Sequence, residues 1–261
     1  MYNYMNNSFE NLDMINRVDK LRDNYNNPHE DPIKKLAEKE NEFRDELSKE
    51  QIDPKSINKI ADRFSNETLE KMEAEQTGHT DLLTGFSNKN SIIDNLPKIL
   101  SSEQRKKQNC SLMMLDLDYF KLVNDTYGHE VGDLVLKDVS RVIKENLRES
   151  DFAFRYGGEE FVVFLMDSDI DVAQIVAEKI RKSVEDAEIK FRDKNDQEVI
   201  LKKTLSIGCV DTKSINSWNV PDKDFDSKLV MEELIKKADE ALYNSKGSGR
   251  NKVMVYNNLK K

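Results

Sequence analysis

Hydrophobic and polar positions alternate between helical and extended patterns from about residue 78 onward. Apolar runs of strand length predict buried strands, and apolar residues spaced three and four apart predict amphipathic helices. The predicted helices are 90–100, 131–147, 172–184 and 231–244, and the predicted strands are 110–117, 151–156, 160–165 and 252–256. The segment 199–210 fits one long strand or the second arm of a hairpin, and 211–228 fits a polar loop.

Gly157 and Gly158 stand between two of the predicted strands. Adjacent glycines there predict a two-residue hairpin turn of the primed type, which needs positive φ angles. The resulting β-α-β-β-α-β order with extra helices predicts an α+β sandwich, in which helices pack on one mainly antiparallel sheet. We assign residues 78–257 to this domain.

Residues 1–77 form a polar extension with a different pattern. The first thirty residues are rich in asparagine, which is typical of loosely ordered chain. Charged helices are predicted at 33–47 and 54–76, and the second carries only a thin apolar stripe. It fits a helix packed on the following domain and a short dimerising helix equally well.

Composition excludes several classes of protein. The 41 Lys+Arg against 50 Asp+Glu give a formal net charge of −9, which disfavours broad nucleic-acid binding. No apolar run approaches the length of a membrane helix, and Met1–Glu10 lacks the features of a signal peptide. Cys110 and Cys209 are isolated in apolar surroundings, so neither a metal site nor a disulfide framework is indicated. We therefore expect a cytoplasmic protein without membrane insertion.

Two carboxylates end the predicted strand 110–117. Asp116 and Asp118 are two residues apart and so project to the same side of an extended chain. Paired negative charge after a buried strand is costly without a cation, and oxygen ligands suit Mg²⁺. The alternative is that Asp118 caps a helix while Asp116 is solvated. Glu159 and Glu160, directly after the glycine pair, add carboxylates that a metal centre could share, although a lone turn of this kind would more simply be solvated.

These segments resemble the motifs of the GGDEF domain, the catalytic module of diguanylate cyclases. The matching segments are Asp81-Leu-Leu-Thr-Gly-Phe-Ser-Asn88, Asp116-Leu-Asp-Tyr-Phe-Lys-Leu-Val-Asn-Asp125, Tyr127-Gly-His-Glu-Val-Gly-Asp133, Arg155-Tyr-Gly-Gly-Glu-Glu-Phe161, Ser206-Ile-Gly208 and Ala238-Asp-Glu-Ala-Leu-Tyr243, followed by Lys246 and Arg250. The resemblance covers residues 78–256. It implies a fold like nucleotide cyclases and polymerase palm domains, and the condensation of two GTP into cyclic di-GMP.

The resemblance also assigns a metal centre. Asp116, the backbone carbonyl of Leu117 and Glu159 would hold Mg²⁺, with Mn²⁺ as an alternative ion, and Glu160 would assist. Glu159 is also the family's suggested proton acceptor for the ribose 3′-hydroxyl, although a metal-bound carboxylate is a weak base. Lys121 would stabilise charge on the phosphates.

Substrate binding is implied at further motif positions. Lys246 and Arg250 would grip the outer phosphates of GTP. Asn124 and Asp133 match the guanine-reading positions, and Phe120 and His129 belong to the same pocket. A carboxylate at Asp133 can accept from guanine N1–H and the exocyclic amine, whereas adenine offers no proton at N1, so GTP is expected over ATP.

The family's active site is a half-site, so the resemblance implies a working homodimer. It also assigns Arg148 and Asp151 to an inhibitory RxxD site that binds cyclic di-GMP. A salt bridge at a helix end is the simpler alternative for this pair. Where the family commonly has a secondary arginine, this chain has Lys179, which keeps the charge but loses the two-pronged geometry. Two other functions stay open: a receptor that binds GTP or cyclic di-GMP without turnover, and a cyclase making a mixed adenine-guanine product.

Overall fold

The computed structural model describes residues 78–193 and 196–256. The chain divides into two units, Met1–Thr80 and Asp81–Lys261. The predictions for residues 1–77, including the helices at 33–47 and 54–76, lie outside the described residues.

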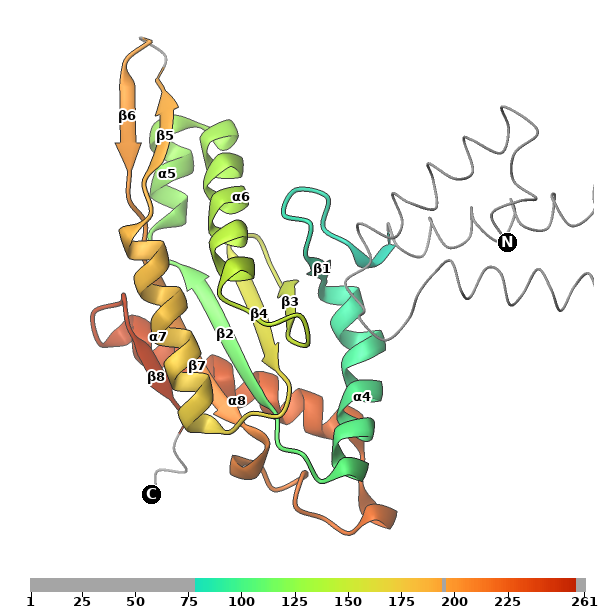
Figure 1. The fold of residues 1–261 in the computed structure, drawn as a ribbon. Coiled ribbons are helices and arrows are strands. Elements are labelled where there is room, and N and C mark those ends of the chain that lie inside the picture. The colour runs from blue at the N-terminus through green and yellow to red at the C-terminus, as the bar shows by residue number, and fades with distance from the viewer. Residues whose placement is uncertain (1–77, 194–195, 257–261) are drawn as a thin grey trace, which may run out of the picture. The chain divides into compact units, whose positions relative to one another are not determined.

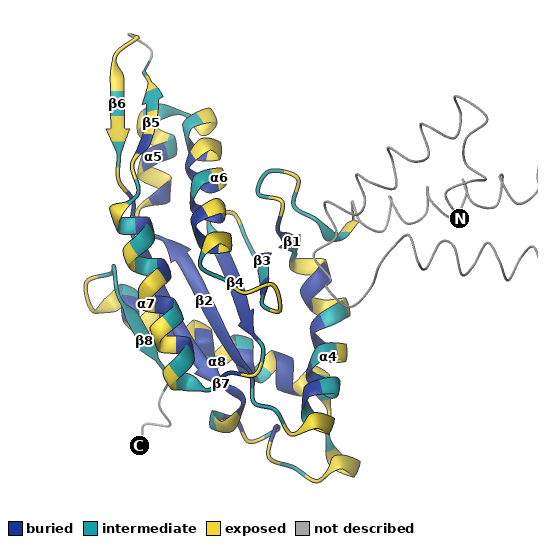
Figure 2. Cartoon of the chain, viewed as in Figure 1, coloured by how far each residue is buried: buried dark blue, intermediate teal, exposed yellow. Residues whose placement is uncertain are grey.

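A six-stranded sheet of order β1-β3-β4-β2-β7-β8 forms the centre of the domain (Figure 1). The bounds are β1 Ser87–Asn88, β2 Ser111–Leu117, β3 Phe152–Arg155, β4 Glu160–Leu165, β7 Leu205–Asp211 and β8 Val253–Val255. The central strand β2 pairs antiparallel with both β4 and β7, while the edge strands β1 and β8 pair parallel with their neighbours. Every residue of β2 and β7 is buried, as their apolar composition requires (Figure 2).

Helices cover both faces of this sheet. The alternation of β2 sends Met113 and Leu115 into a core with α5, α6 and α7, and Leu112 and Met114 into a second core with α4 and α8. The bounds are α4 Lys89–Lys106, α5 Phe120–Tyr127, α6 His129–Glu145, α7 Ile170–Asp186 and α8 Ser227–Gly247. The predicted α+β sandwich is confirmed. Among the described residues, no helix is both long enough and apolar enough to span a membrane.

The segment 199–210 divides into two strands. Glu198–Leu201 is β6, the second arm of a separate hairpin with β5 (Ile189–Arg192), and β7 begins only at Leu205. The prediction of one long strand is therefore wrong. The chain leaves the hairpin at Lys202–Thr204 because the side chains of Lys203 and Thr204 turn toward Asp118, where both donate hydrogen bonds.

Two other sequence predictions need correction. Helix α5 was read only as a motif, because its eight residues are too few for a clear helical period. The predicted polar loop 211–228 contains two short 3₁₀ helices, Thr212–Ser214 and Asp222–Asp224. Trp218 within it is buried and packs edge-to-face against Phe225, with ring centroids 5.7 Å apart.

Candidate active site

The carboxylate of Asp116 lies near the end of β2, between two neighbouring strands. In the sheet register Asp116 is opposite Glu160 of β4 and Ser206 of β7. Its side chain is 8% exposed, and its Oδ2 lies 2.7 Å from Nζ of Lys246, near the C-terminal end of α8. The structure thus brings a predicted metal ligand and a predicted phosphate-binding lysine into direct contact.

The connection between β3 and β4 brings Glu159 to the same end of the sheet as Asp116. We call this pair of carboxylates, at the end of β2, the acidic edge. Residues 156–159 form a four-residue connection in which the Glu160 carbonyl accepts from the backbone N–H groups of Tyr156 and Gly157, at 2.8 and 3.2 Å. Gly157 and Gly158 lack positive φ angles, so the predicted two-residue primed turn is wrong. Instead, Arg155 Nη2 donates to the Gly158 carbonyl at 2.8 Å, and Leu117 N–H donates to the Glu159 carbonyl at 3.2 Å.

The two carboxylates share a region of unfavourable negative potential. Burial raises the pKa of Asp116, and Lys246 and Arg250 oppose that rise. Burial and the nearby Asp116 charge raise the pKa of Glu159, again opposed by Lys246. A bound cation would relieve both effects, so the residues present fit a divalent ion.

The protein supplies only part of a coordination shell. Within residues 78–193 and 196–256, no three His, Cys, Asp or Glu side chains converge closely enough to hold a metal. Among the described residues, Asp116 and Glu159 therefore do not belong to a set of three convergent side-chain ligands.

Asp118 has a structural role in this fold. It is 1% exposed and accepts hydrogen bonds from Thr204 Oγ1 and Ser206 Oγ, each at 2.7 Å, and from the Asn251 backbone N–H at 3.0 Å. The cap of α5 is Tyr119, without a side-chain bond. The sequence reading of Asp118 as a helix cap is therefore wrong.

Lys203 was missed by the sequence reading. It is buried, and its Nζ donates to the Asp118 carbonyl. Burial lowers the pKa of Lys203, while Asp118 and Glu159 oppose that shift. Lys203 therefore places a third cation near the acidic edge, beside Lys246 and Arg250. Lys203 stands between Lys202 and Thr204, and this sequence gives no pattern that could have revealed its role.

The predicted guanine-reading residues lie where α5 meets α6. Oδ1 of Asn124 is buried and has no hydrogen-bond partner within the described residues. A Cβ on Gly132 would come within 2.0 Å of that oxygen and 3.3 Å of the Phe120 ring, so glycine keeps this junction open. Asp133 follows on α6, and His129 begins that helix; both are exposed.

The predicted phosphate-binding residues separate into two groups. Arg250 joins Lys246 near Asp116, and its guanidinium lies 4.7 Å from the ring centroid of Tyr119. Lys121 is 85% exposed and pairs with Asp125 at 3.4 Å. Among the described contacts, none joins Lys121 to the carboxylates.

The predicted inhibitory residues surround the end of α6. The carboxylate of Asp151 accepts from the backbone N–H groups of Arg148 and Met166, at 3.0 and 3.3 Å, while Arg148 itself is exposed. Burial raises the pKa of Asp151, and these bonds oppose the rise. Lys179 is exposed on α7, and no contact within the described residues joins it to Arg148 or Asp151.

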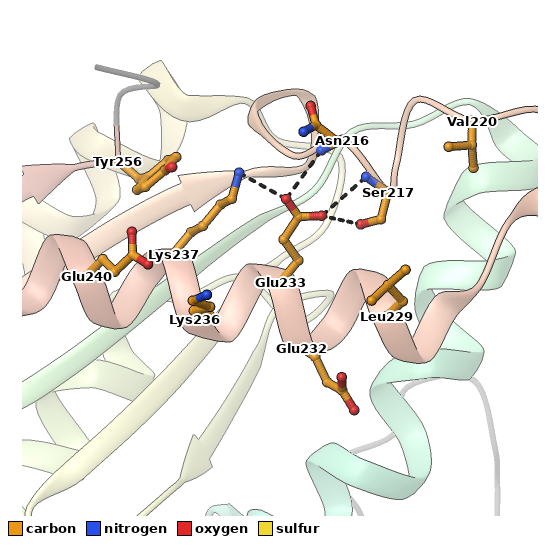
Figure 3. A pocket seen from close by; sticks show the side chains of 10 residues that line it. All are labelled: Asn216, Ser217, Val220, Leu229, Glu232, Glu233, Lys236, Lys237, Glu240 and Tyr256. Carbon is orange, nitrogen blue, oxygen red and sulfur yellow. Dashed lines mark hydrogen bonds and ion pairs between the residues drawn. The ribbon is translucent and has the colours of Figure 1, made fainter. Parts of the chain in front are cut away.

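A separate pocket of about 710 Å³ lies between α8 and the 211–228 segment (Figure 3). Glu233 on its wall accepts from Ser217 and pairs with Lys237 at 3.0 Å. The lining residues are Asn216, Ser217, Val220, Leu229, Glu232, Glu233, Lys236, Lys237, Glu240 and Tyr256. None of them is a predicted site residue. Lys246 lies roughly 20 Å beyond Glu233 along the axis of α8. We therefore place the chemistry at the acidic edge and not in this pocket.

The fold and the acidic edge define a nucleotide-cyclase type of domain. Residues 78–252 match the family model described as "Diguanylate cyclase, GGDEF domain", and the chain belongs to this family. The resemblance stated from the motifs is confirmed.

Known proteins of the family share this domain. Diguanylate cyclase A of Treponema denticola is 40% identical over 186 residues, which cover 70% of this chain and 46% of that protein. This chain therefore spans about half the length of that relative. The crystal structure of the GGDEF domain of DgcB from Caulobacter crescentus in complex with c-di-GMP has a TM-score of 0.59 at 30% identity, covering 69% of this chain and 93% of that one. Diguanylate cyclase SiaD of Pseudomonas aeruginosa, in complex with its activator SiaC, has a TM-score of 0.59 at 27% identity, covering 94% and 85%.

Proposed function

We propose that this protein is a diguanylate cyclase that condenses two GTP into cyclic di-GMP and two pyrophosphates. The observation that carries this proposal is the acidic edge itself: the charge of Asp116 adds to burial in raising the pKa of Glu159, and Lys246 pairs directly with Asp116. A site that combines two carboxylates with phosphate-binding cations, in a chain of the GGDEF family, suits phosphoryl transfer.

Asp116, the Leu117 carbonyl and Glu159 would hold Mg²⁺, with Glu160 assisting and Mn²⁺ as the alternative ion. The bound ion would neutralise triphosphate oxygens and the charge that develops during transfer. Each ribose 3′-oxygen forms a bond to the α-phosphorus of the other GTP as the bond to the pyrophosphate oxygen breaks. The 3′-hydroxyl proton leaves to Glu159 or to water, and Lys246 and Arg250 hold the departing phosphates.

Asn124 and Asp133 would read the guanine, with Phe120 and His129 completing the pocket. The unpartnered Oδ1 of Asn124 supports this assignment, because a buried acceptor without a donor is costly unless a ligand supplies one. A guanine N–H group is such a donor, and adenine has no proton at N1.

Two such sites must face each other, because each subunit binds one GTP. We propose a homodimer in which residues 1–77 bring the catalytic domains together, so that proximity supplies much of the rate. Deleting residues 1–77 should lower both the number of chains per particle, measured as sedimentation mass divided by chain mass, and the turnover per chain. Unchanged values of both would reject this role.

Product inhibition is proposed at Arg148 and Asp151, with Lys179 as the second basic group. The exposed guanidinium of Arg148 is available to a phosphate or a guanine edge. Asp151 is already held in position by two backbone N–H groups.

The deciding experiment is product identification by chromatography and mass after incubation with GTP and Mg²⁺. Wild type is compared with Glu159→Gln and with Glu198→Gln, an exposed glutamate on β6 that serves as the matched control. We expect cyclic di-GMP from wild type and the control, and at least a hundredfold less from Glu159→Gln. Binding of GTP without any product, after bound nucleotide is removed and the protein is concentrated, would favour the receptor function. A mixed dinucleotide formed from GTP with ATP would favour the other cyclase.

A further inference from the structure

The turn after α8 carries Arg250 in an unusual backbone conformation. Gly249, Arg250 and Asn251 all have positive φ angles, of 106°, 61° and 46°. The left-handed region is unfavourable for residues with a Cβ, so two such residues in succession need support from their surroundings. One support is local, because Arg250 N–H donates to the Ser245 carbonyl at 3.1 Å.

Asn251 supplies the remaining support through three hydrogen bonds to other elements. Its backbone N–H donates to Asp118 Oδ2 at 3.0 Å. Its side-chain Nδ2 donates to Glu185 Oε1 of α7 at 2.7 Å. Its Oδ1 accepts from Arg181 Nη1, also of α7, at 2.7 Å.

The partner of the backbone N–H is itself fixed. Asp118 is buried, is held by Thr204 and Ser206, and lies two residues after Asp116. The neighbouring residues of the two segments also meet, because the Arg250 guanidinium lies over the Tyr119 ring. The turn therefore contacts two successive residues, Asp118 and Tyr119, which directly follow β2.

We propose that Asn251 is a positioning residue, clamped by Glu185 and Arg181, that holds the phosphate-binding Arg250 at a set distance from the metal-binding end of β2. This rests on the proposed function, because it assumes that Arg250 binds phosphate there. Asn251 does not touch the nucleotide. Helix α7 thereby contributes to triphosphate binding, although it carries no residue that the proposed mechanism places on GTP.

The two carboxylates that pair with Arg181 provide a matched test. Glu178 and Glu185 each contact Arg181 at 2.8 Å, but of these two only Glu185 also binds the Asn251 amide. The readout is the affinity for 3′-deoxy-GTP, which lacks the attacking hydroxyl, relative to the affinity for 3′-deoxy-GMP. We expect Glu185→Ala to weaken 3′-deoxy-GTP binding about fivefold, the value of one hydrogen bond. Binding of 3′-deoxy-GMP should change less than twofold, and Glu178→Ala should leave both affinities within twofold.

Two further variants separate positioning from stability. Glu185→Gln retains an acceptor for the Asn251 amide and should restore most of the 3′-deoxy-GTP affinity. Asn251→Gly tolerates the positive φ angle and keeps the backbone donor but loses both side-chain bonds, so it should behave like Glu185→Ala. In turnover, both Glu185→Ala and Asn251→Gly should raise the KM for GTP with a smaller change in kcat.

The outcomes for the two proposals differ. Equal losses in Glu178→Ala and Glu185→Ala, or equal losses for the two nucleotides, would overturn the positioning role while leaving cyclase activity intact. If wild type binds 3′-deoxy-GTP no better than 3′-deoxy-GMP, the phosphate grip is absent and the positioning role is rejected. Absence of cyclic di-GMP alone would reject only the proposed cyclase, since the binding comparison needs no turnover.

Discussion

The ammonium group of Lys246 lies 2.7 Å from Oδ2 of Asp116. The two side chains have different proposed partners, since Asp116 would hold a metal and Lys246 would hold phosphate. Under the proposed function, metal and GTP binding would exchange these partners. The ion would take the carboxylate, and the lysine would move to the phosphates.

This exchange predicts opposite effects of one substitution. Lys246→Gln should tighten Mn²⁺ binding without nucleotide by about threefold to fivefold, because a partly exposed competing pair is lost. The KM for GTP should rise about tenfold or more, because a charged phosphate contact is removed. Calorimetric Mn²⁺ titration and steady-state kinetics measure the two effects. Lys236→Gln, on the exposed face of the same helix, is the control, and equal Mn²⁺ affinity in all three proteins would contradict the exchange.

We expect the Asn124 side chain to contribute to GTP binding and not to the stability of the fold. Asn124→Ala removes a buried acceptor that has no partner among the described residues, so the free energy of unfolding should stay within about 0.5 kcal/mol of wild type or rise. The KM for GTP should increase about tenfold. Denaturant unfolding and kinetics test both halves. Asn95→Ala, whose amide already donates to Ser91, should instead lose stability and leave the KM unchanged.

A pH effect follows from the Asp81–Arg155 ion pair, which spans 2.9 Å. Burial alone would raise the pKa of Asp81, but hydrogen bonds from Thr84 and the Arg155 guanidinium hold that pKa below the ordinary aspartate value of 3.8. The folded state thus favours the carboxylate, and the contact stabilises the domain above that pH and loses its effect as the pH falls below it.

The matching variant is Asp81→Asn. It should lower the free energy of unfolding by about 1 to 2 kcal/mol at pH 7, and by much less at pH 3. Denaturant titrations of both proteins at both pH values give the comparison. A difference that is the same at pH 3 and pH 7 would show that the carboxylate charge contributes nothing.

Gly208 permits the close approach of β7 to α8. A Cβ there would lie 2.2 Å from the Ala238 carbonyl oxygen and from the Leu242 nitrogen, both backbone atoms that cannot rotate away. Gly208→Ala should therefore destabilise the domain by about 2 to 3 kcal/mol. Gly247→Ala, in helix α8 with nothing within 4 Å, should be neutral or stabilising by about 0.5 to 1 kcal/mol. Thermal unfolding of the two variants should move in opposite directions, and a stable Gly208→Ala protein would contradict the packing.

The inhibitory site can be tested in both directions. Arg148→Ala should raise the half-inhibitory concentration of cyclic di-GMP about tenfold or more, because a two-pronged contact is lost. Lys179→Arg should lower it severalfold by restoring that geometry. Arg141→Ala, which breaks surface pairs with Asp138 and Glu145 on α6, is the control. Identical inhibition curves for all four proteins would place product binding elsewhere.

The sequence predicted the elements whose pattern is long or strongly apolar. Strands β2 and β4 were found because burial on both faces leaves a continuous apolar run. Helices α6 and α7 were found because burial of one stripe leaves a helical period. Helix α5 and the β5–β6 hairpin were harder to read because short elements leave few positions in which a period can appear.

The site shows the same division. Motif spacing located Asp116, Glu159 and Lys246, and the fold brings these three together. The surrounding contacts could not be predicted from the sequence. Lys203 and Asn251 bind Asp118 from segments that are 85 and 133 residues away along the chain. The sequence also contained no sign that the hydroxyl groups of Thr204 and Ser206 donate hydrogen bonds to Asp118.

The register of β2 has a consequence for how the proposed activity could change over generations. Asp116 stands opposite Glu160 and Ser206 in the same ladders that align the core. A slip by one residue would turn every buried side chain of β2 to the opposite face. The register that packs the core therefore also aligns the carboxylates. Inactive descendants would therefore arise by replacement of single side chains on an intact sheet. Such descendants would keep the folded domain, which selection could adapt to bind a nucleotide without turnover.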